Sequence, residues 1–205
     1  MKKIILCLDN GNKSMNSVKD YLKTHNCEVY TLPEEDVDHS TFFEEIKQKE
    51  GYIDLLLLGA AENTMEDGAI DEAHDYDKLL ESVGDQINRI QNVIDEALPL
   101  LRKGNLKRIG MITKKESSIS CCRENNNYGL HMTWAGLNMV GKIYFNLLRP
   151  EGFTFRWYCA EENAGGISAG EYLLSGLCYD KNEPYCHSDE NRFVMRDSYL
   201  REIPW

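Results

Sequence analysis

The segment between residues 117 and 131 holds a concentration of side chains that could transfer protons or act as nucleophiles. These side chains are the hydroxyl groups of Ser117, Ser118 and Tyr128, the thiols of Cys121 and Cys122, and the imidazole of His131. Such groups are the usual general acids, general bases and nucleophiles of enzymes. Each also has an ordinary structural role. The serines can hydrogen-bond a loop, the tyrosine can lie on a loop surface, and the histidine can pack in a helix.

The seven cysteines favour free thiols in a reducing compartment. Their number is odd and none forms a C-x-x-C pair, whereas disulfides belong mainly to oxidising compartments. A redox pair at Cys121–Cys122 is the alternative. Cys186 and His187 have no matching ligand pair elsewhere, so we expect no metal site.

Size and charge restrict the possible partners. A chain of 205 residues fits one domain and can form a core without disulfides. Its net charge of -11 argues against binding to nucleic acid or to an anionic membrane. The sequence has no apolar run of membrane-spanning length and no signal peptide. We therefore expect a cytoplasmic protein.

Apolar runs of strand length alternate with segments of helical periodicity. This pattern predicts one doubly wound α/β domain over residues 1–205, with a Rossmann-like parallel sheet. Ser14 is the expected cap of the first helix. The expected strands are 3–8, 27–32, 53–58, 107–113, 153–158 and an edge strand at 193–195, and the expected helices are 14–25, 36–49 with its cap, 79–103, 128–148 and 167–174.

The helix that begins at Tyr128 resembles a motif of the short-chain dehydrogenase/reductase family. Tyr128-Gly-Leu-His-Met-Thr-Trp-Ala-Gly-Leu-Asn-Met139 is similar to the Tyr-x-x-x-Lys helix, which usually continues as Ala-Ala-Leu-Asn-Met. If residues 135–139 fix the register, Trp134 stands at the place of the lysine and Leu130 at that of the tyrosine. The resemblance therefore implies that the usual proton donor and its cationic partner are both replaced.

Three other segments resemble the same family in the same order. Residues 52–61 resemble the strand that normally ends in Asn-Asn-Ala-Gly, residues 94–112 resemble the long helix and the strand after it, and residues 192–205 resemble the tail of some bacterial members. Together the matches cover roughly the whole chain. The resemblance implies a Rossmann-like fold and, in an intact member, oxidoreductase activity with NAD or NADP.

The cofactor loop departs from the family pattern. Thr-Gly-x-x-x-Gly-x-Gly falls on residues 8–15, where Asp9, Lys13 and Met15 replace the three glycines that allow backbone to approach the pyrophosphate. We expect this degenerate site to bind no cofactor, and we expect Met15 and Trp134 to protrude into the dinucleotide space. The candidate cofactor-binding residues that the resemblance implies are Asp9, Gly11, Lys13, Ser14, Gly59 and Ala60.

The candidate catalytic residues are Ser117, Ser118 and Tyr128. Either serine matches the family position that orients the substrate oxygen. Tyr128 lies two residues before the expected tyrosine position, which is about 200° around a helix. The short segment between the second strand and Asp54 also implies that about one helix and one strand of the usual sheet are missing.

Three functional hypotheses follow. The first is a divergent family member without hydride transfer that acts as a binding or assembly subunit. It would form a homo-oligomer through helices of about residues 79–103 and 128–148, or pair with an active relative. The second is an NAD- or NADP-dependent oxidoreductase of a small carbonyl or alcohol. The third is a different enzyme that uses Tyr128, His131 or Cys121.

Overall fold

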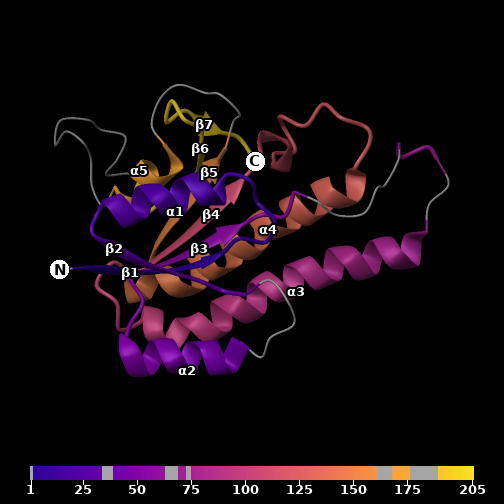
Figure 1. Cartoon of the computed structure of the whole chain (residues 1–205). Coiled ribbons are helices and arrows are strands. Elements are labelled where there is room, and N and C mark those ends of the chain that lie inside the picture. Colours follow the sequence, from indigo (N-terminus) through magenta and orange to yellow (C-terminus); the bar gives the residue numbers. More distant parts are fainter. Residues whose placement is uncertain (1, 34–38, 63–68, 73–74, 161–167, 176–188) are drawn as a thin grey trace.

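The computed structural model describes residues 2–33, 39–62, 69–72, 75–160, 168–175 and 189–205. One seven-stranded sheet runs through this part of the chain, in the order β2-β1-β3-β4-β5-β6-β7 (Figure 1). All neighbouring strands are parallel except β6 and β7, which are antiparallel. The strands are β1 Lys3–Leu8, β2 Cys27–Thr31, β3 Leu55–Gly59, β4 Arg108–Thr113, β5 Thr154–Cys159, β6 Met195–Arg196 and β7 Glu202–Ile203.

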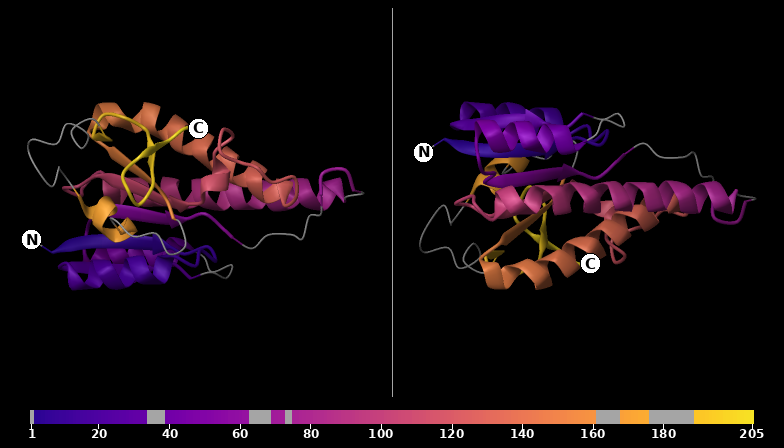
Figure 2. Two further views of the ribbon diagram at one scale, coloured as in Figure 1. Left: turned by 90° about the horizontal axis from the view of Figure 1, so that it is seen from above. Right: turned by 90° about the horizontal axis from the view of Figure 1, so that it is seen from below.

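Helices cover both faces of the sheet. On one face lie α2 (His39–Lys49), α3 (Tyr76–Leu101) and α4 (Tyr128–Leu148), and on the other lie α1 (Met15–Thr24) and α5 (Ala169–Leu174). Helices α3 and α4 run side by side (Figure 2). Short 3-10 helices follow β4 (Lys115–Ser117) and α4 (Arg149–Glu151). The predicted doubly wound α/β fold is confirmed.

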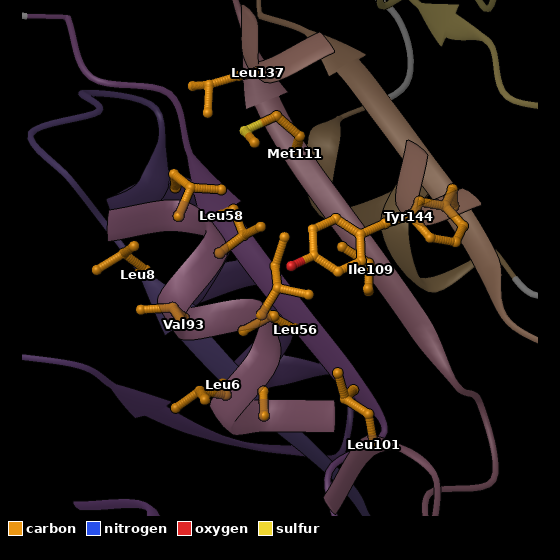
Figure 3. Packing of buried hydrophobic residues seen from close by; sticks show 14 of the residues in the cluster. Leu6, Leu8, Leu56, Leu58, Val93, Leu101, Ile109, Met111, Leu137 and Tyr144 are labelled. Carbon is orange, nitrogen blue, oxygen red and sulfur yellow. The ribbon is translucent and has the colours of Figure 1, made fainter. Parts of the chain in front are cut away.

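The central strand β3 shows why the sheet must be covered on both sides. All five of its residues are buried, and successive side chains of a strand point to opposite faces. Leu56 and Leu58 pack in the cluster beneath α3 and α4, where Figure 3 shows them near Val93. Leu55 and Leu57 pack in the cluster beneath α1 and α5. A continuous apolar strand is therefore buried in two cores at once.

Two local expectations differ from the structure. The last parallel strand is Met195–Arg196, not 193–195, and it is not at the edge, because Glu202–Ile203 pairs with it on the outer side. Ser14 makes no capping hydrogen bond through its side chain. Asn12 Oδ1 accepts the N–H of Ser14 itself at 3.1 Å, just before the helix. At the opposite edge of the sheet, β2 pairs with β1.

No helix of the described part is both long and apolar enough to cross a membrane.

A buried hydrogen bond joins α4 to α3 and should make stability depend on pH. The Tyr144 hydroxyl donates to Asp95 Oδ1 at 2.6 Å. Burial and, second, this bond to Asp95 raise the pKa of Tyr144 above its ordinary value. The folded state therefore keeps a proton that the unfolded chain loses near about pH 10. The resulting stability is complete below that pH and is lost as the pH rises.

We expect the urea midpoint of unfolding to fall between about pH 9 and about pH 11, and to fall less in Tyr144→Phe. Burial also raises the pKa of Tyr172, so part of the fall should remain in that variant. Tyr199→Phe, at an exposed tyrosine, is the matched control, and its urea midpoint should fall as much as that of the native chain. A slope as steep in Tyr144→Phe as in the native chain would contradict the assignment.

Candidate functional site

The loop between β1 and α1 lies at the carboxyl edge of the sheet, where open α/β folds bind their ligands. Asn10 and Gly11 have positive φ angles of 52° and 70°, so the chain turns sharply there. Gly11 has open space around the position of a Cβ. The Asp9 carboxylate forms an ion pair with Lys19 of α1. The charge of Asp9 is therefore balanced by a cation of the same chain.

Four successive backbone N–H groups of this loop, those of residues 12–15, are bonded within the protein. Asn12 N–H donates to the Asp9 carbonyl at 2.9 Å, and Met15 N–H to the Asn12 carbonyl at 3.2 Å. Ser14 N–H donates to Asn12 Oδ1, and Lys13 N–H donates to Glu62 Oε1 at 3.2 Å. Phosphates bind at helix N-termini through such N–H groups. Four successive donors of the expected phosphate site are thus engaged.

Glu62 places an internal carboxylate beside the start of α1. Besides the Lys13 N–H, its Oε1 lies 3.4 Å from Lys114 Nζ, and the Glu62 side chain is only 6% exposed. Its partner on the α1 side is 49 residues away, and no local pattern indicates that contact.

Asn12 fastens the loop to the ends of two strands. Its Nδ2 donates to the Ala60 carbonyl at 2.9 Å and to the Ile112 carbonyl at 3.3 Å. The loop also lies directly on Gly59, because a Cβ there would be 2.2 Å from the Asp9 carbonyl oxygen. The Asn that the family motif places at this position therefore could not be accommodated without movement of the loop. Gly59 and Ala60 are therefore in direct contact with the packed loop.

Replacing Asn12 by Asp should lower the free energy of unfolding by about 1–3 kcal/mol, because the new carboxylate oxygen would face the two carbonyl oxygens that now accept hydrogen bonds. Urea unfolding followed by tryptophan fluorescence measures the change. Asn16→Asp, an exposed position in the first turn of α1, is the control. Equal effects at the two positions would show that the loop does not depend on Asn12.

Trp134 and Met15 are both buried, but in different ways. The Trp134 indole is 6% exposed, donates from Nε1 to the Ala61 carbonyl at 2.7 Å and stacks on the His131 ring. It thus lies against the segment that directly follows β3. Met15 is fully buried in the cluster between α1 and the sheet. We expected Met15 to protrude into the dinucleotide space, whereas its side chain is fully buried in the interior.

The candidate catalytic hydroxyl groups are not gathered around one point by any described contact. Ser117 Oγ donates to Met195 Sδ at 3.6 Å. Ser118 Oγ donates to the carbonyl of Pro204 and accepts the Cys121 N–H. Tyr128 is the first residue of α4 and is half-buried. The serines therefore connect the segment after β4 to the C-terminal strands, and a catalytic role for any of the three stays a prediction.

Metal binding has no candidate among the described residues, where no group of three or more His, Cys, Asp or Glu side chains could hold an ion. Cys186 and His187 lie outside the described ranges. Cys7, Cys27 and Cys159 are buried free thiols, whereas Cys121 and Cys122 are half-buried free thiols. The described cysteines therefore agree with the expectation of unpaired thiols.

Comparison with solved structures identifies the fold. The putative carbonyl reductase Sniffer of Caenorhabditis elegans superimposes with a TM-score of 0.77 at 14% identity, over all of both chains. A putative short-chain alcohol dehydrogenase from Burkholderia multivorans gives 0.66 at 14% identity, also over all of both chains. RhlG of Pseudomonas aeruginosa, in an active-site complex with NADP, gives 0.64 at 13% identity over 77% of this chain and 71% of that one. The fold is that of short-chain dehydrogenases/reductases.

Sequence comparison finds similarity over a smaller part of the chain. The C-signal protein of Myxococcus xanthus is 36% identical over 62 residues, which are 30% of this chain and 37% of that protein. The chain therefore matches little more than a third of this relative's length. No protein-family model matches the chain.

Proposed function

We propose that this chain is a divergent protein with the short-chain dehydrogenase/reductase fold that does not carry out hydride transfer and acts as a binding or assembly subunit. The engaged N–H groups of the loop between β1 and α1 carry the proposal. Lys13 N–H in particular donates to the Glu62 carboxylate, so a diphosphate would have to displace an anion of the protein itself. Binding a second anion beside it is unfavourable.

The second support is the chemistry at the start of α4. In the register of the family motif, the position of the lysine is taken by Trp134 and that of the tyrosine by Leu130. Trp134 has no charge to place beside a ribose, and its indole N–H is already bonded to Ala61. Leu130 has no proton to transfer and packs against the core. Hydride transfer that depends on these two groups therefore has no proton donor here.

Exposed side chains of α4 support an assembly role. Many apolar residues of α3 and α4, such as Val93, Ile94 and Leu137, are buried in the chain's own core. A row of apolar side chains along one face of α4 is instead exposed at 48–61%, and we call this row the α4 stripe. It consists of Met132, Met139, Ile143 and Leu147. Exposed apolar stripes of this kind mark interaction surfaces, and a two-fold contact would place the stripe against its copy.

Sedimentation velocity tests the assembly role. The native chain should sediment as a dimer or a larger oligomer, and Ile143→Glu should weaken association by at least about 10-fold, because each copy would bury a charge against the other. Asn16→Glu, an exposed position of α1 on the opposite face of the sheet, is the matched control. A monomeric native chain, or equal weakening in both variants, would contradict assembly through the α4 stripe.

An NAD- or NADP-dependent reductase of a small carbonyl or alcohol is the second candidate. It is favoured by the structural likeness to a putative carbonyl reductase, a putative alcohol dehydrogenase and a protein solved with NADP. In this chain it would require Glu62 to release Lys13 N–H. Oxidation of NADH or NADPH, followed by absorbance with a panel of small aldehydes and ketones, separates the two candidates. We expect no turnover above that of the buffer.

A further inference from the structure

The segment after β4 brings a thiol, an imidazole and a carboxylate into line. Cys122 Sγ lies 3.0 Å from His131 Nδ1. On the other side of the ring, His131 Nε2 lies 3.5 Å from Glu124 Oε2. Cys122 belongs to the turn before α4 and His131 to the first turns of that helix, so the contact depends on the fold of residues 122–131. Just before this segment, Ser120 Oγ donates to the Trp205 carbonyl at 2.8 Å, and Figure 1 shows the chain after β4 near the C-terminus.

This order of groups is the one required for nucleophilic catalysis. A nucleophile must lie within hydrogen-bonding distance of a base, and a third group must orient the base. Here His131 can accept the thiol proton at Nδ1, while the Glu124 carboxylate stabilises the imidazolium that forms. The half-buried thiol remains open enough to react. Stacking of His131 on Trp134, with ring centroids 5.5 Å apart, holds the plane of the imidazole.

An apolar cavity lies along α4 from one helical turn beyond His131, and its lining does not include Cys122, Glu124 or His131. Its volume is about 410 Å³, and its walls include Ile119, three residues before Cys122, and Ala135, one helical turn after His131. Farther along, Met139, Phe193 and Trp205 contribute to the lining. A cavity of this size and polarity fits an aliphatic or aromatic group of a small ligand.

We propose that Cys122 is a nucleophile that accepts acyl groups from small thioesters or activated esters, with His131 as its general base and Glu124 as the residue that positions His131. The Cys122 thiolate attacks the acyl carbonyl, and a new carbon–sulfur bond forms. The bond to the leaving thiol or alcohol breaks, and the leaving group takes the proton from His131. Water then attacks the acyl-thiol with His131 again as base, which releases the acid and restores the thiol. No oxidant and no dinucleotide takes part.

Acylation by p-nitrophenyl butanoate, followed by nitrophenolate release and by peptide mass spectrometry, tests the proposal. Cys122 should acquire the butanoyl group in a burst, and Cys122→Ser should abolish the burst. His131→Gln should slow acylation of Cys122 on the order of 100-fold, which is the usual contribution of a general base. Cys121→Ser changes the neighbouring thiol only and should leave the burst intact.

Two further measurements separate a chemical role from a structural one. Acylation of Cys121 by the same ester should be as slow in His131→Gln as in the native chain, because a disrupted segment would expose both thiols. Glu124→Gln should slow acylation of Cys122, and Glu124→Asp, which retains the carboxylate, should restore most of the rate. Equal acylation of Cys121 and Cys122 in the native chain, or a Cys122 rate that does not change in His131→Gln, would overturn the proposal.

Discussion

Replacing Glu190 by Ala is expected to lower the free energy of unfolding by about 3–5 kcal/mol, because the change leaves buried charges without a partner. The Glu190 carboxylate pairs with Nη2 of both Arg108 and Arg156. These two arginines are only 1% and 2% exposed. They lie on adjacent strands, with Arg108 at the start of β4 and Arg156 within β5.

The electrostatics of Arg108 explain why this loss should be large. Burial and, second, the neighbouring Arg156 lower the pKa of Arg108 to about 9, and the Glu190 carboxylate opposes that shift. Backbone carbonyls of Leu173 and Ser175 also accept hydrogen bonds from Arg108 Nη1. Without Glu190, the two guanidinium groups would keep hydrogen bonds to backbone carbonyls but would repel each other with no carboxylate between them.

Equilibrium unfolding in urea measures the loss at Glu190. Glu151→Ala is the control, because Glu151 makes a two-bond ion pair with Arg102 that is largely exposed. Exposed pairs of this kind contribute about 0–1 kcal/mol. A loss in Glu190→Ala no larger than that in Glu151→Ala would show that the buried arginines are stabilised in some other way.

Trp134→Ala is expected to lower the free energy of unfolding by a similar amount, about 3–5 kcal/mol. The substitution removes a nearly fully buried indole, its stacking on His131 and its hydrogen bond to the Ala61 carbonyl. A cavity and an acceptor without its donor would remain at the end of β3. Both changes destabilise the folded state.

The chain offers a matched tryptophan for comparison. Trp205 is 39% exposed and stacks on Phe193, so Trp205→Ala should cost about 1 kcal/mol, which is the usual contribution of an aromatic pair. Thermal and urea unfolding of both variants give the comparison. If the two substitutions are equally destabilising, Trp134 does not fill the interior in the way described.

Most of the sheet and the long helices could be predicted from the sequence alone. The strand at Leu55–Gly59 and the helices at Tyr76–Leu101 and Tyr128–Leu148 have apolar patterns that few other structures satisfy. The strands at Met195–Arg196 and Glu202–Ile203 have two residues each, which is too short for any periodicity. Their pairing depends on tertiary contacts, so the sequence interpretation misplaced one strand and missed the other.

The candidate site was predictable in part. The motif register drew attention to Trp134, but it could not indicate that the indole bonds to Ala61, 73 residues away in the chain. Asn12 and Glu62 were missed because the contacts that hold the loop to the strand ends and to α1 join residues at least 48 positions apart. The contact between Cys122 and His131 spans only nine residues, yet it depends on how the chain turns into α4, and residue types alone do not specify that turn.

The most direct test of the account is a titration of the purified chain with NAD, NADH, NADP and NADPH while its melting temperature is followed. A ligand at 100 times its Kd stabilises the folded state by about 2.7 kcal/mol, which for a chain of this length corresponds to about 5–10 °C. We expect no shift in melting temperature with any of the four nucleotides. The loop N–H donors are engaged, the Glu62 carboxylate lies beside them, and Trp134 is buried. A shift of several degrees with any of them would contradict the account.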